Sequence, residues 1–322
     1  MSLLILSEHE VRELLDMESC IDAMTEVLTS LARDELFQPL RSVVRPPDAA
    51  GLLGLMPSHR SGEHAAYALK EIVVTPDNPT RGLDAHQGAV LLHDGATGEL
   101  VALLNASPVT AIRTAAVSGV ATRALARSDA GRVAILGAGV QARAHVDAMR
   151  AVLDDPEIRI WARRIEAAEE LAAEVGAMAS PSPDAALFGA EVVCTTTSSR
   201  EPVLEHRWLA PGAHVNAVGS SIPTARELDT ETVRRSSLFV DRRESTLNEA
   251  GDYLMPAAEG AIGPEHIKAE LGEVLAGLAP GRTDEEEFTV FKSLGIGVED
   301  LAAAELVVVR APERGIGTEV PF

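Results

Sequence analysis

The sequence predicts an α/β protein in which a doubly wound parallel sheet accompanies a mostly antiparallel sheet. The chain of 322 residues is long enough for two domains, and 46% of it is hydrophobic. Between about residues 40 and 104, the apolar residues follow a period of two, which is typical of antiparallel strands. After Asp129, apolar strands alternate with helical segments, and this alternation indicates a parallel sheet with helices on both faces.

The first 127 residues are expected to hold two helices with strands between them. Residues 8–35 carry apolar side chains at three- and four-residue intervals, which indicates a helix. Turn clusters separate the expected strands, which are Leu40–Arg45, Ala65–Thr75, Gly88–His93 and Leu100–Leu104. Ser107 and Pro108 then supply a cap and a first helical residue for a helix that runs to about Arg127.

The remaining chain carries the alternating pattern. Its expected strands and helices are Arg132–Leu136, Gln141–Leu153, Ile158–Trp161, Ile165–Val175, Glu191–Thr196, His214–Val218 and Leu238–Asp241. A loop rich in Gly and Pro is expected at Ala250–Pro264, a solvated turn at the acidic run Asp284–Glu287, and a last helix from about Val298 to Val309.

The charge balance excludes two classes of partner. The chain has 28 Lys and Arg against 49 Asp and Glu, a net charge of −21, so it repels nucleic acid and anionic membranes. Only three of the 28 are lysine: Lys70, Lys268 and Lys292. This composition fits a salt-tolerant source and a GC-rich source equally well. A lysine within an apolar segment of such a chain suggests chemistry that needs an amine.

The sequence also bounds the compartment. We find no signal peptide at the start of the chain and no run of 18 apolar residues that predicts a membrane span. Cys20 and Cys194 show no metal-ligand spacing, so we expect neither a disulfide framework nor a zinc site. A cytoplasmic location is therefore expected.

The most specific motif is the G-x-G-x-x-A run from Gly137 through Gly139, Val140 and Gln141 to Ala142, which follows a strand and opens a helix. Such glycines allow a tight turn and a close approach of the backbone to a pyrophosphate at a helix N-terminus. Glycine pairs at strand ends often only make turns, but within a strand–helix–strand unit this one predicts dinucleotide binding.

The end of the second strand bears on the choice of cofactor. NAD-binding folds usually place an acid there for the ribose hydroxyls, whereas this chain has Ala162, Arg163 and Arg164. Two arginines suit a 2′-phosphate, so the sequence favours NADP(H), with NAD(H) as the alternative. In the competing interpretation, the arginines only solvate a helix start.

Three cations are candidates for the reaction site. Lys70 shares a strand face with Ala68, Ile72 and Val74, where an ammonium is costly unless it is paired or used; the alternative is an edge-strand lysine that prevents aggregation. Arg113 aligns with the apolar residues Val117, Val120 and Ala124 of its helix and suits a carboxylate or phosphate. Arg41 shares a face with Arg45 as a second half of an anion clamp; the alternative is two surface arginines.

The histidines show no metal pairing, so no metal site is expected, and no Ser-His-Asp arrangement or nucleophile elbow appears. A dinucleotide site with a lysine and convergent arginines instead indicates hydride transfer at the carbon that bears an amino or imino acid's carboxylate.

These residues resemble the ornithine cyclodeaminase and mu-crystallin family, which also contains archaeal-type alanine dehydrogenases and imine reductases. The resemblance runs nearly end to end. Its motifs are Gln38–Arg41, Gly54–Pro57, Leu69–Lys70, Thr110–Ala116, the glycine run, Asn216–Ser220, Val290–Gly295 and Val298–Leu301.

The resemblance implies a homodimer with a Rossmann domain inserted into the other domain. Residues 1–120 with 302–322 then form a substrate-binding and dimerisation domain, and residues 121–301 form the NAD(P)-binding domain. It also implies that Arg41 and Arg113 hold the substrate carboxylate while Lys70 serves the reacting nitrogen centre. We assign further substrate contacts to Met56 and Ser221, and further cofactor contacts to Thr114, Thr196, Val218, Ser220 and Ser293.

Two departures from the family pattern narrow the chemistry. Cyclodeaminases carry a glutamate where this chain has Gly54 and an aspartate where it has Ser221. The Ser221 variant resembles the mu-crystallin branch, whose members resemble NADPH-dependent ketimine reductases. The resemblance therefore implies an NADPH-dependent reductase of cyclic ketimines or α-imino carboxylates, such as pyrroline- or piperideine-2-carboxylate. The alternatives are an amino-acid or opine-type dehydrogenase, the cyclodeaminase itself, and a non-catalytic, crystallin-like NADPH-binding protein.

Overall fold

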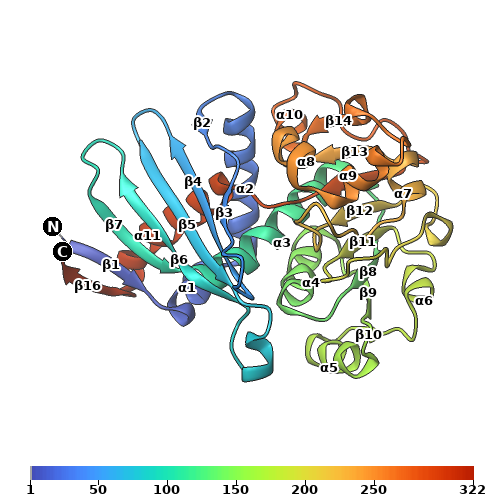
Figure 1. The fold of residues 1–322 in the computed structure, drawn as a ribbon, viewed down its shortest axis with the longest axis horizontal. Coiled ribbons are helices and arrows are strands. Elements are labelled where there is room, and N and C mark those ends of the chain that lie inside the picture. Colours follow the sequence, from blue (N-terminus) through green and yellow to red (C-terminus); the bar gives the residue numbers. More distant parts are fainter. Residues whose placement is uncertain (1) are drawn as a thin grey trace. The chain divides into compact units, whose positions relative to one another are not determined.

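The computed structural model describes residues 2–322, which form two compact units (Figure 1). Unit 1 contains the described residues up to Arg113 together with Gly295–Phe322, and unit 2 contains Thr114–Leu294. Both borders lie a few residues before the 120/121 and 301/302 borders that the sequence suggests. The helix α3 (Ala106–Leu125) contains the first border. Among the described residues, no helix combines the length and the apolar character that a membrane span requires.

Unit 1 is built on a mixed sheet with the order β16-β1-β7-β6-β5-β4-β2, in which β3 also pairs with β4. Only β1 and β7 pair in parallel. The strands are β1 (Ser2–Leu6), β2 (Leu36–Phe37), β3 (Ser42–Val44), β4 (Leu52–Arg60), β5 (Ala66–Val74), β6 (His86–Asp94), β7 (Leu100–Asn105) and β16 (Thr318–Pro321). The helices are α1 (Glu8–Leu14), α2 (Met17–Ala32), the 3₁₀ turn η1 (Asn78–Arg81) and α11 (Gly297–Arg314).

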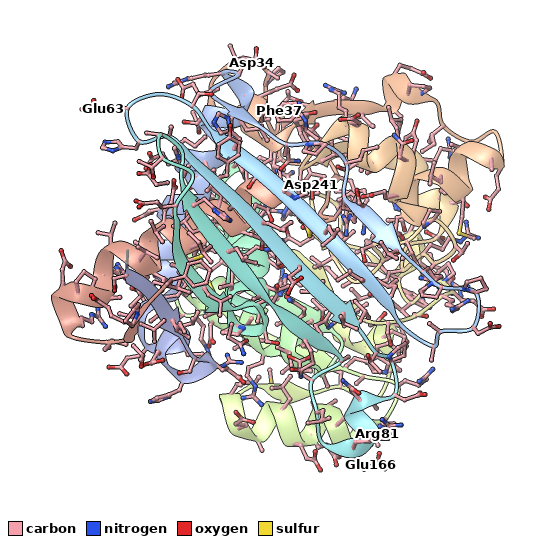
Figure 2. The ribbon with its side chains drawn as sticks, turned by 60° about the vertical axis from the view of Figure 1, so that its left-hand side comes forward. Asp34, Phe37, Glu63, Arg81, Glu166 and Asp241 are labelled. Carbon is pink, nitrogen blue, oxygen red and sulfur yellow. The ribbon has the colours of Figure 1, made fainter. Side chains whose placement is uncertain are left out.

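One face of this sheet is covered by α11, which packs on β4, β5 and β6 and against α2 (Figure 1). Along β5, the residues that face α11 are buried or partly buried, and Tyr67 and Val73 on the other face are about half exposed. Figure 2 shows Glu63 at the β4–β5 turn at one end of the long strands and Arg81 at their other end. The period of two in the sequence therefore arises because a helix covers only one face of the sheet.

The single helix expected over residues 8–35 is wrong. Leu15 ends α1, and Asp16 caps α2 by accepting a hydrogen bond from the Ser19 amide at 2.9 Å. Both helices turn apolar residues inward, so the apolar spacing continues across the break. The Asp16 cap is the local signal that marks the break.

Unit 2 is a parallel sheet of eight strands in the order β10-β9-β8-β11-β12-β15-β13-β14. The strands are β8 (Arg132–Leu136), β9 (Glu157–Trp161), β10 (Met178–Ala179), β11 (Val192–Thr195), β12 (His214–Ala217), β13 (Ser237–Val240), β14 (Ile267–Glu270) and β15 (Thr289–Lys292). The helical segments are α4 (Val140–Val152), α5 (Ile165–Val175), α6 (Pro183–Leu187), η2 (His206–Trp208), α7 (Thr230–Arg235), α8 (Arg243–Glu249), α9 (Gly251–Ala258), η3 (Pro264–His266) and α10 (Leu271–Leu275). The doubly wound α/β fold expected from the sequence is confirmed.

The loop expected at Ala250–Pro264 is also wrong in its first part, because Gly251–Ala258 is the helix α9. Gly251 is needed for close packing and not for a turn, since a Cβ there would lie 2.8 Å from the Ile222 carbonyl oxygen. Pro256 lies inside this helix and is buried there, and it removes one backbone N–H donor from α9.

Two histidines of unit 2, His145 and His214, are fully buried. The ring of His214 contacts the Thr289 hydroxyl at 2.9 Å and the Asn216 side-chain oxygen at 3.2 Å, and the ring of His145 contacts the Ser118 hydroxyl at 2.9 Å. Burial lowers the pKa of His214 to about 3 and that of His145 to about 4. Both rings are therefore neutral in the folded protein at neutral pH.

We expect acid to destabilise unit 2 through these histidines. Between about pH 6 and pH 4 the unfolded chain binds their protons and the folded chain does not, so stability falls as the pH falls, by about 1.4 kcal/mol per pH unit for each ring. His214→Gln should make this slope shallower by about that amount. Urea unfolding followed by fluorescence measures it, because both tryptophans, Trp161 and Trp208, lie in unit 2.

The exposed His9 of unit 1 provides the control, since His9→Gln should leave the slope unchanged. Equal slopes for the wild type and His214→Gln would contradict the prediction.

Candidate active site

Lys70 lies on the buried face of β5 in unit 1. Its side chain is 1% exposed, and the strand lies between β4 and β6. The alternative of an edge-strand lysine is therefore wrong, because an ammonium at this position is enclosed. A buried ammonium persists only when it is paired or when it gives up its proton.

The partner of Lys70 is Asp300, in the first turn of α11. The Lys70 Nζ lies 2.9 Å from each oxygen of this fully buried carboxylate. Burial and then the charge of Arg113 lower the pKa of Lys70 to about 8, although Asp300 opposes both effects. The amine therefore gains and loses a proton close to neutral pH, which suits an acid–base group.

Arg113 shares the same acid. Its Nε donates to Asp300 at 3.0 Å, and its Nη1 donates to Glu299 at 2.5 Å. Arg113 is 3% exposed, so its guanidinium lies inside the protein, as its position on the apolar face of the helix suggests. Asp300 thus connects a cation on β5 with a cation on α3.

Arg41 reaches the same region through the backbone of Gly295. Its Nη2 donates to the Gly295 carbonyl oxygen at 3.3 Å, and a Cβ on Gly295 would collide with the Arg113 guanidinium. Gly295 has a φ of +74°, which also favours glycine. The two guanidinium groups therefore approach the same stretch of backbone, whereas Arg45 is exposed beyond the end of β3.

We call Arg41, Lys70, Arg113, Glu299 and Asp300 together the cation cluster. Its two guanidinium groups and its amine are of the types that bind a ligand carboxylate.

Glu299 and Asp300 are functional candidates to which the sequence motifs assign no role. Two features of the sequence could have indicated them: both acids lie at the start of a helix, and two cations were expected to be buried and so to need acidic partners. What the sequence does not show is the pairing itself, because 230 residues separate Lys70 from Asp300.

Met56 lies beside Lys70, as its register partner on β4, and its side chain is 6% exposed. Gly54 shares the inward face of β4 two residues earlier. Met56 therefore offers an apolar surface next to the ammonium, and no carboxylate stands at Gly54.

In unit 2, the glycine run follows β8 at the carboxyl end of the sheet. Gly137 has a φ of +130°, and a Cβ there would lie 2.5 Å from the Thr196 hydroxyl. Gly139 is the N-cap of α4, and a Cβ on it would meet no atom within 4 Å. The backbone at Gly139 is thus open to a ligand at a helix N-terminus, where a pyrophosphate binds in folds of this kind.

The strand order places this loop at the topological switch point. β8 has β9 on one side and β11 on the other, and chain direction along the sheet reverses between them. Further along the same edge, the Ser293 hydroxyl is buried and has no hydrogen-bond partner among the described residues. The open glycine and the unpartnered hydroxyl fit a bound dinucleotide.

Arg163 and Arg164 lie just beyond the end of β9, and both are exposed. Ala162, between them and the strand, is partly buried. The position is the one at which dinucleotide-binding folds contact the adenosine ribose. The arginine side chains are thus accessible to a phosphate there.

The other predicted contacts all belong to unit 2 and stay predictions. Thr114 begins unit 2, and Thr196, Val218, Ser220 and Ser293 follow the carboxyl ends of β11, β12 and β15; Val140 and Gln141 begin α4. The Ser220 hydroxyl donates to the Ala225 carbonyl. Ser221 also belongs to unit 2, whereas the other predicted substrate contacts belong to unit 1.

Comparison with known proteins identifies the same family that the sequence motifs resemble. The model of the ornithine cyclodeaminase/mu-crystallin family matches residues 1–315. The ketimine reductase mu-crystallin of Mus musculus is 42% identical over 274 residues, which cover 84% of each chain.

Two solved structures are similar over nearly the whole chain. The Δ1-pyrroline-2-carboxylate reductase of Thermococcus litoralis, in complex with NADH and L-proline, has a TM-score of 0.94 and 37% identity and covers 98% of this chain and 100% of its own. An archaeal alanine dehydrogenase dimer with bound NAD has a TM-score of 0.94 and 32% identity, with full coverage of both chains.

Proposed function

The chain belongs to the ornithine cyclodeaminase/mu-crystallin family and is an NAD(P)-dependent oxidoreductase that acts on C–N groups, and from this premise we propose that it reduces cyclic ketimines that carry a carboxylate, such as pyrroline- or piperideine-2-carboxylate. The observation that carries the proposal is the buried cation cluster, in which Lys70 titrates near neutral pH beside Arg113. The relatives named for imine reduction support the same substrate class.

Each cation has a distinct role in this proposal. Arg41 and Arg113 bind the substrate carboxylate, which places the adjacent C=N carbon at a fixed position. The Lys70 ammonium donates a proton to the nitrogen or stabilises positive charge there, and Asp300 holds the ammonium in place. A bound nicotinamide supplies the hydride, so one imine and one proton give one amine with oxidation of one NAD(P)H.

The residues at two positions disfavour ring-closing deamination. Gly54 offers no carboxylate on β4, and Ser221 offers a hydroxyl where cyclodeaminases carry an aspartate. A second amino group on the substrate therefore finds no acid at either position. Reduction of an imine needs neither acid, because the carboxylate and the nitrogen are served by the three cations.

We expect the purified protein to oxidise NADPH in the presence of pyrroline- or piperideine-2-carboxylate, and more slowly with 2-oxoacids and amines. The reduction rate should fall above about pH 8, because the proton on Lys70 is lost there. Absorbance of the reduced cofactor measures both results. Release of ammonia from ornithine without net cofactor change would instead identify a cyclodeaminase.

Lys70→Ala supplies the matched control for this experiment. Its kcat should be lower by about a hundredfold, without the decline above pH 8, and its affinity for NADPH should be unchanged. A fully active variant would remove Lys70 from the reaction. Tight NADPH binding without turnover on any substrate would favour the non-catalytic alternative.

For the cofactor, we propose a preference for NADPH over NADH. The exposed Arg163 and Arg164 support it, because they stand where a 2′-phosphate would lie and no acid is present to bind the ribose hydroxyls. The two similar structures contain NADH and NAD, so the proposed preference rests on this chain's own residues alone.

Replacing both arginines by alanine should weaken NADPH binding by about tenfold or more and leave NADH binding unchanged, since only NADPH carries the 2′-phosphate. Titration calorimetry with each cofactor measures the two constants. Arg207→Ala is the control, because Arg207 is an exposed arginine elsewhere in unit 2. Equal affinity of the wild type for NADH and NADPH would refute the preference.

We also propose that the protein is a homodimer formed by the outer face of the unit 1 sheet. Apart from Glu71, the residues of β5 on this face are apolar although α11 does not cover it: Tyr67 and Val73 are about half exposed, and Leu69 is partly buried beside its register partner Leu91. An apolar face of this kind is typical of a subunit interface.

The two free thiols, Cys20 and Cys194, support a reducing cytoplasm as the location.

Leu69→Glu should convert the dimer into a monomer, because it places a charge in the centre of the apolar face. Light scattering after size-exclusion chromatography measures the mass. Leu278→Glu is the control, since Leu278 is exposed in unit 2 and lies outside this face. A variant that stays dimeric would place the interface elsewhere.

A further inference from the structure

Glu227 is a fully buried carboxylate in unit 2 that the reaction does not use directly. Its Oε1 accepts hydrogen bonds from the amide and the hydroxyl of Thr197, at 2.6 and 2.7 Å. Its Oε2 accepts from the Thr195 hydroxyl at 2.8 Å and from the Gly219 amide at 2.7 Å. One side chain thus binds the segments that follow two neighbouring strands, β11 and β12.

The geometry around Gly219 shows how tightly these segments are held. A Cβ on Gly219 would lie 2.6 Å from the Glu227 Oε1 and 2.6 Å from the Thr197 nitrogen. Only glycine therefore lets the β12 segment approach the carboxylate and the β11 segment together. The predicted cofactor contacts Thr196 and Val218 are the immediate neighbours of the residues that Glu227 binds.

Glu227 and the segments that it binds, Thr195–Thr197 and Gly219, are called the clamp below. Two further buried charged residues, Asp252 and Lys292, extend the clamp to a third strand. Asp252 accepts from the amides of Glu227 and Leu228 at 2.8 and 3.0 Å, and one of its oxygens lies 3.1 Å from the Lys292 Nζ. Lys292 ends β15 and donates to the Ala217 carbonyl oxygen at 3.0 Å. The residue after Lys292 is Ser293, whose hydroxyl has no partner among the described residues.

The clamp lies on one side of the switch point. Arg163 and Arg164, which face the adenosine end of a dinucleotide, follow β9, whereas the clamp holds the ends of β11, β12 and β15 on the opposite side of β8. A dinucleotide that crosses the glycine loop extends its nicotinamide half over these strand ends.

We propose that Glu227 is a positioning residue for the nicotinamide half of the cofactor, acting through the Thr195–Thr197 and Gly219 segments. The inference rests on the proposed NAD(P)-dependent function and adds to it a residue that touches neither cofactor nor substrate. Preorganised strand ends bind the nicotinamide half without an ordering cost, so the energetic effect of Glu227 falls on that half alone.

A glutamine cannot replace Glu227, although it has the same shape. Each carboxylate oxygen accepts from one backbone N–H, of Thr197 or of Gly219, and a backbone N–H cannot turn into an acceptor. In either orientation the amide NH₂ therefore meets a backbone donor. Glu227→Gln leaves a buried donor unsatisfied and loosens one of the two segments.

The test compares whole cofactors with fragments that lack nicotinamide. Calorimetry gives the affinities of the full-length protein for NADPH and for 2′-phospho-ADP-ribose, and for NADH and ADP-ribose. Glu227→Gln should weaken the binding of both reduced cofactors by about tenfold and leave both fragments unchanged, because the fragments do not reach the clamped strand ends. A residue with a merely structural role would weaken cofactor and fragment together.

Thr195 provides a milder pair of variants that acts through the same carboxylate. Thr195→Val removes one donor, and Thr195 is itself fully buried, so the whole cofactor should bind about threefold more weakly while the fragment binding stays constant. Thr195→Ser keeps the hydroxyl and should restore the affinity. This series decides the matter if Glu227→Gln does not fold.

The outcomes separate the two proposals. A wild-type protein that binds neither NADPH nor NADH overturns the proposed function, and the positioning role with it. A wild type that binds its cofactor normally, with equal losses for cofactor and fragment or no loss in the Thr195→Val and Glu227→Gln variants, overturns the positioning role alone.

Discussion

The carboxylate of Asp300 is the contact on which unit 1 depends. It binds Lys70 of β5 and Arg113 of α3 at the same time, from the first turn of a helix near the end of the chain. Removing it would leave Lys70 without its acid partner and Arg113 with Glu299 alone, and an unpaired buried charge costs several kcal/mol. The two segments of unit 1, which are far apart in the sequence, are therefore held together by these buried ion pairs as well as by the packing of α11 on the sheet. The same contact raises the pKa of the Lys70 amine, in opposition to the larger effect of burial, which lowers it.

Much of the fold follows from periodicity, and its failures have physical causes. The helix α5 has the bounds expected from the sequence, and the parallel sheet of unit 2 is confirmed, because a strand buried on both faces reads as a continuous apolar run. The long N-terminal helix was wrong because α1 and α2 bury the same face and only the Asp16 cap marks the break. The loop at Ala250–Pro264 was wrong in its first part because Gly251 is needed for close packing and not for a turn, and because α9 contains Pro256. The short strands β1 and β16, which pair across nearly the whole chain, carry no local signal strong enough to predict their partners.

The candidate site could be predicted in part. Lys70 and Arg113 stood out because a charge on an apolar face is unusual, and the glycine run stood out because its spacing is constrained. The acids that hold these cations did not, because a pair of carboxylates at a helix start is common and its partners lie on distant segments. The clamp around Glu227 was missed for the same reason: its four donors come from three residues whose proximity arises only when two strands become neighbours. Sequence patterns show which groups need partners, and topology decides which partners they find.

The scarcity of lysine has a practical consequence. Lys70 and Lys292 are both 1% exposed, each against an aspartate and each in a different unit, whereas Lys268 is exposed. An amine-reactive reagent therefore meets a single lysine side chain on the folded surface. Labelling at Lys292 requires unit 2 to open, whereas labelling at Lys70 requires the reagent to enter the proposed substrate site or unit 1 to open. A reagent larger than the substrate therefore makes the two buried amines probes of local unfolding, one for each unit, and mass spectrometry can detect both.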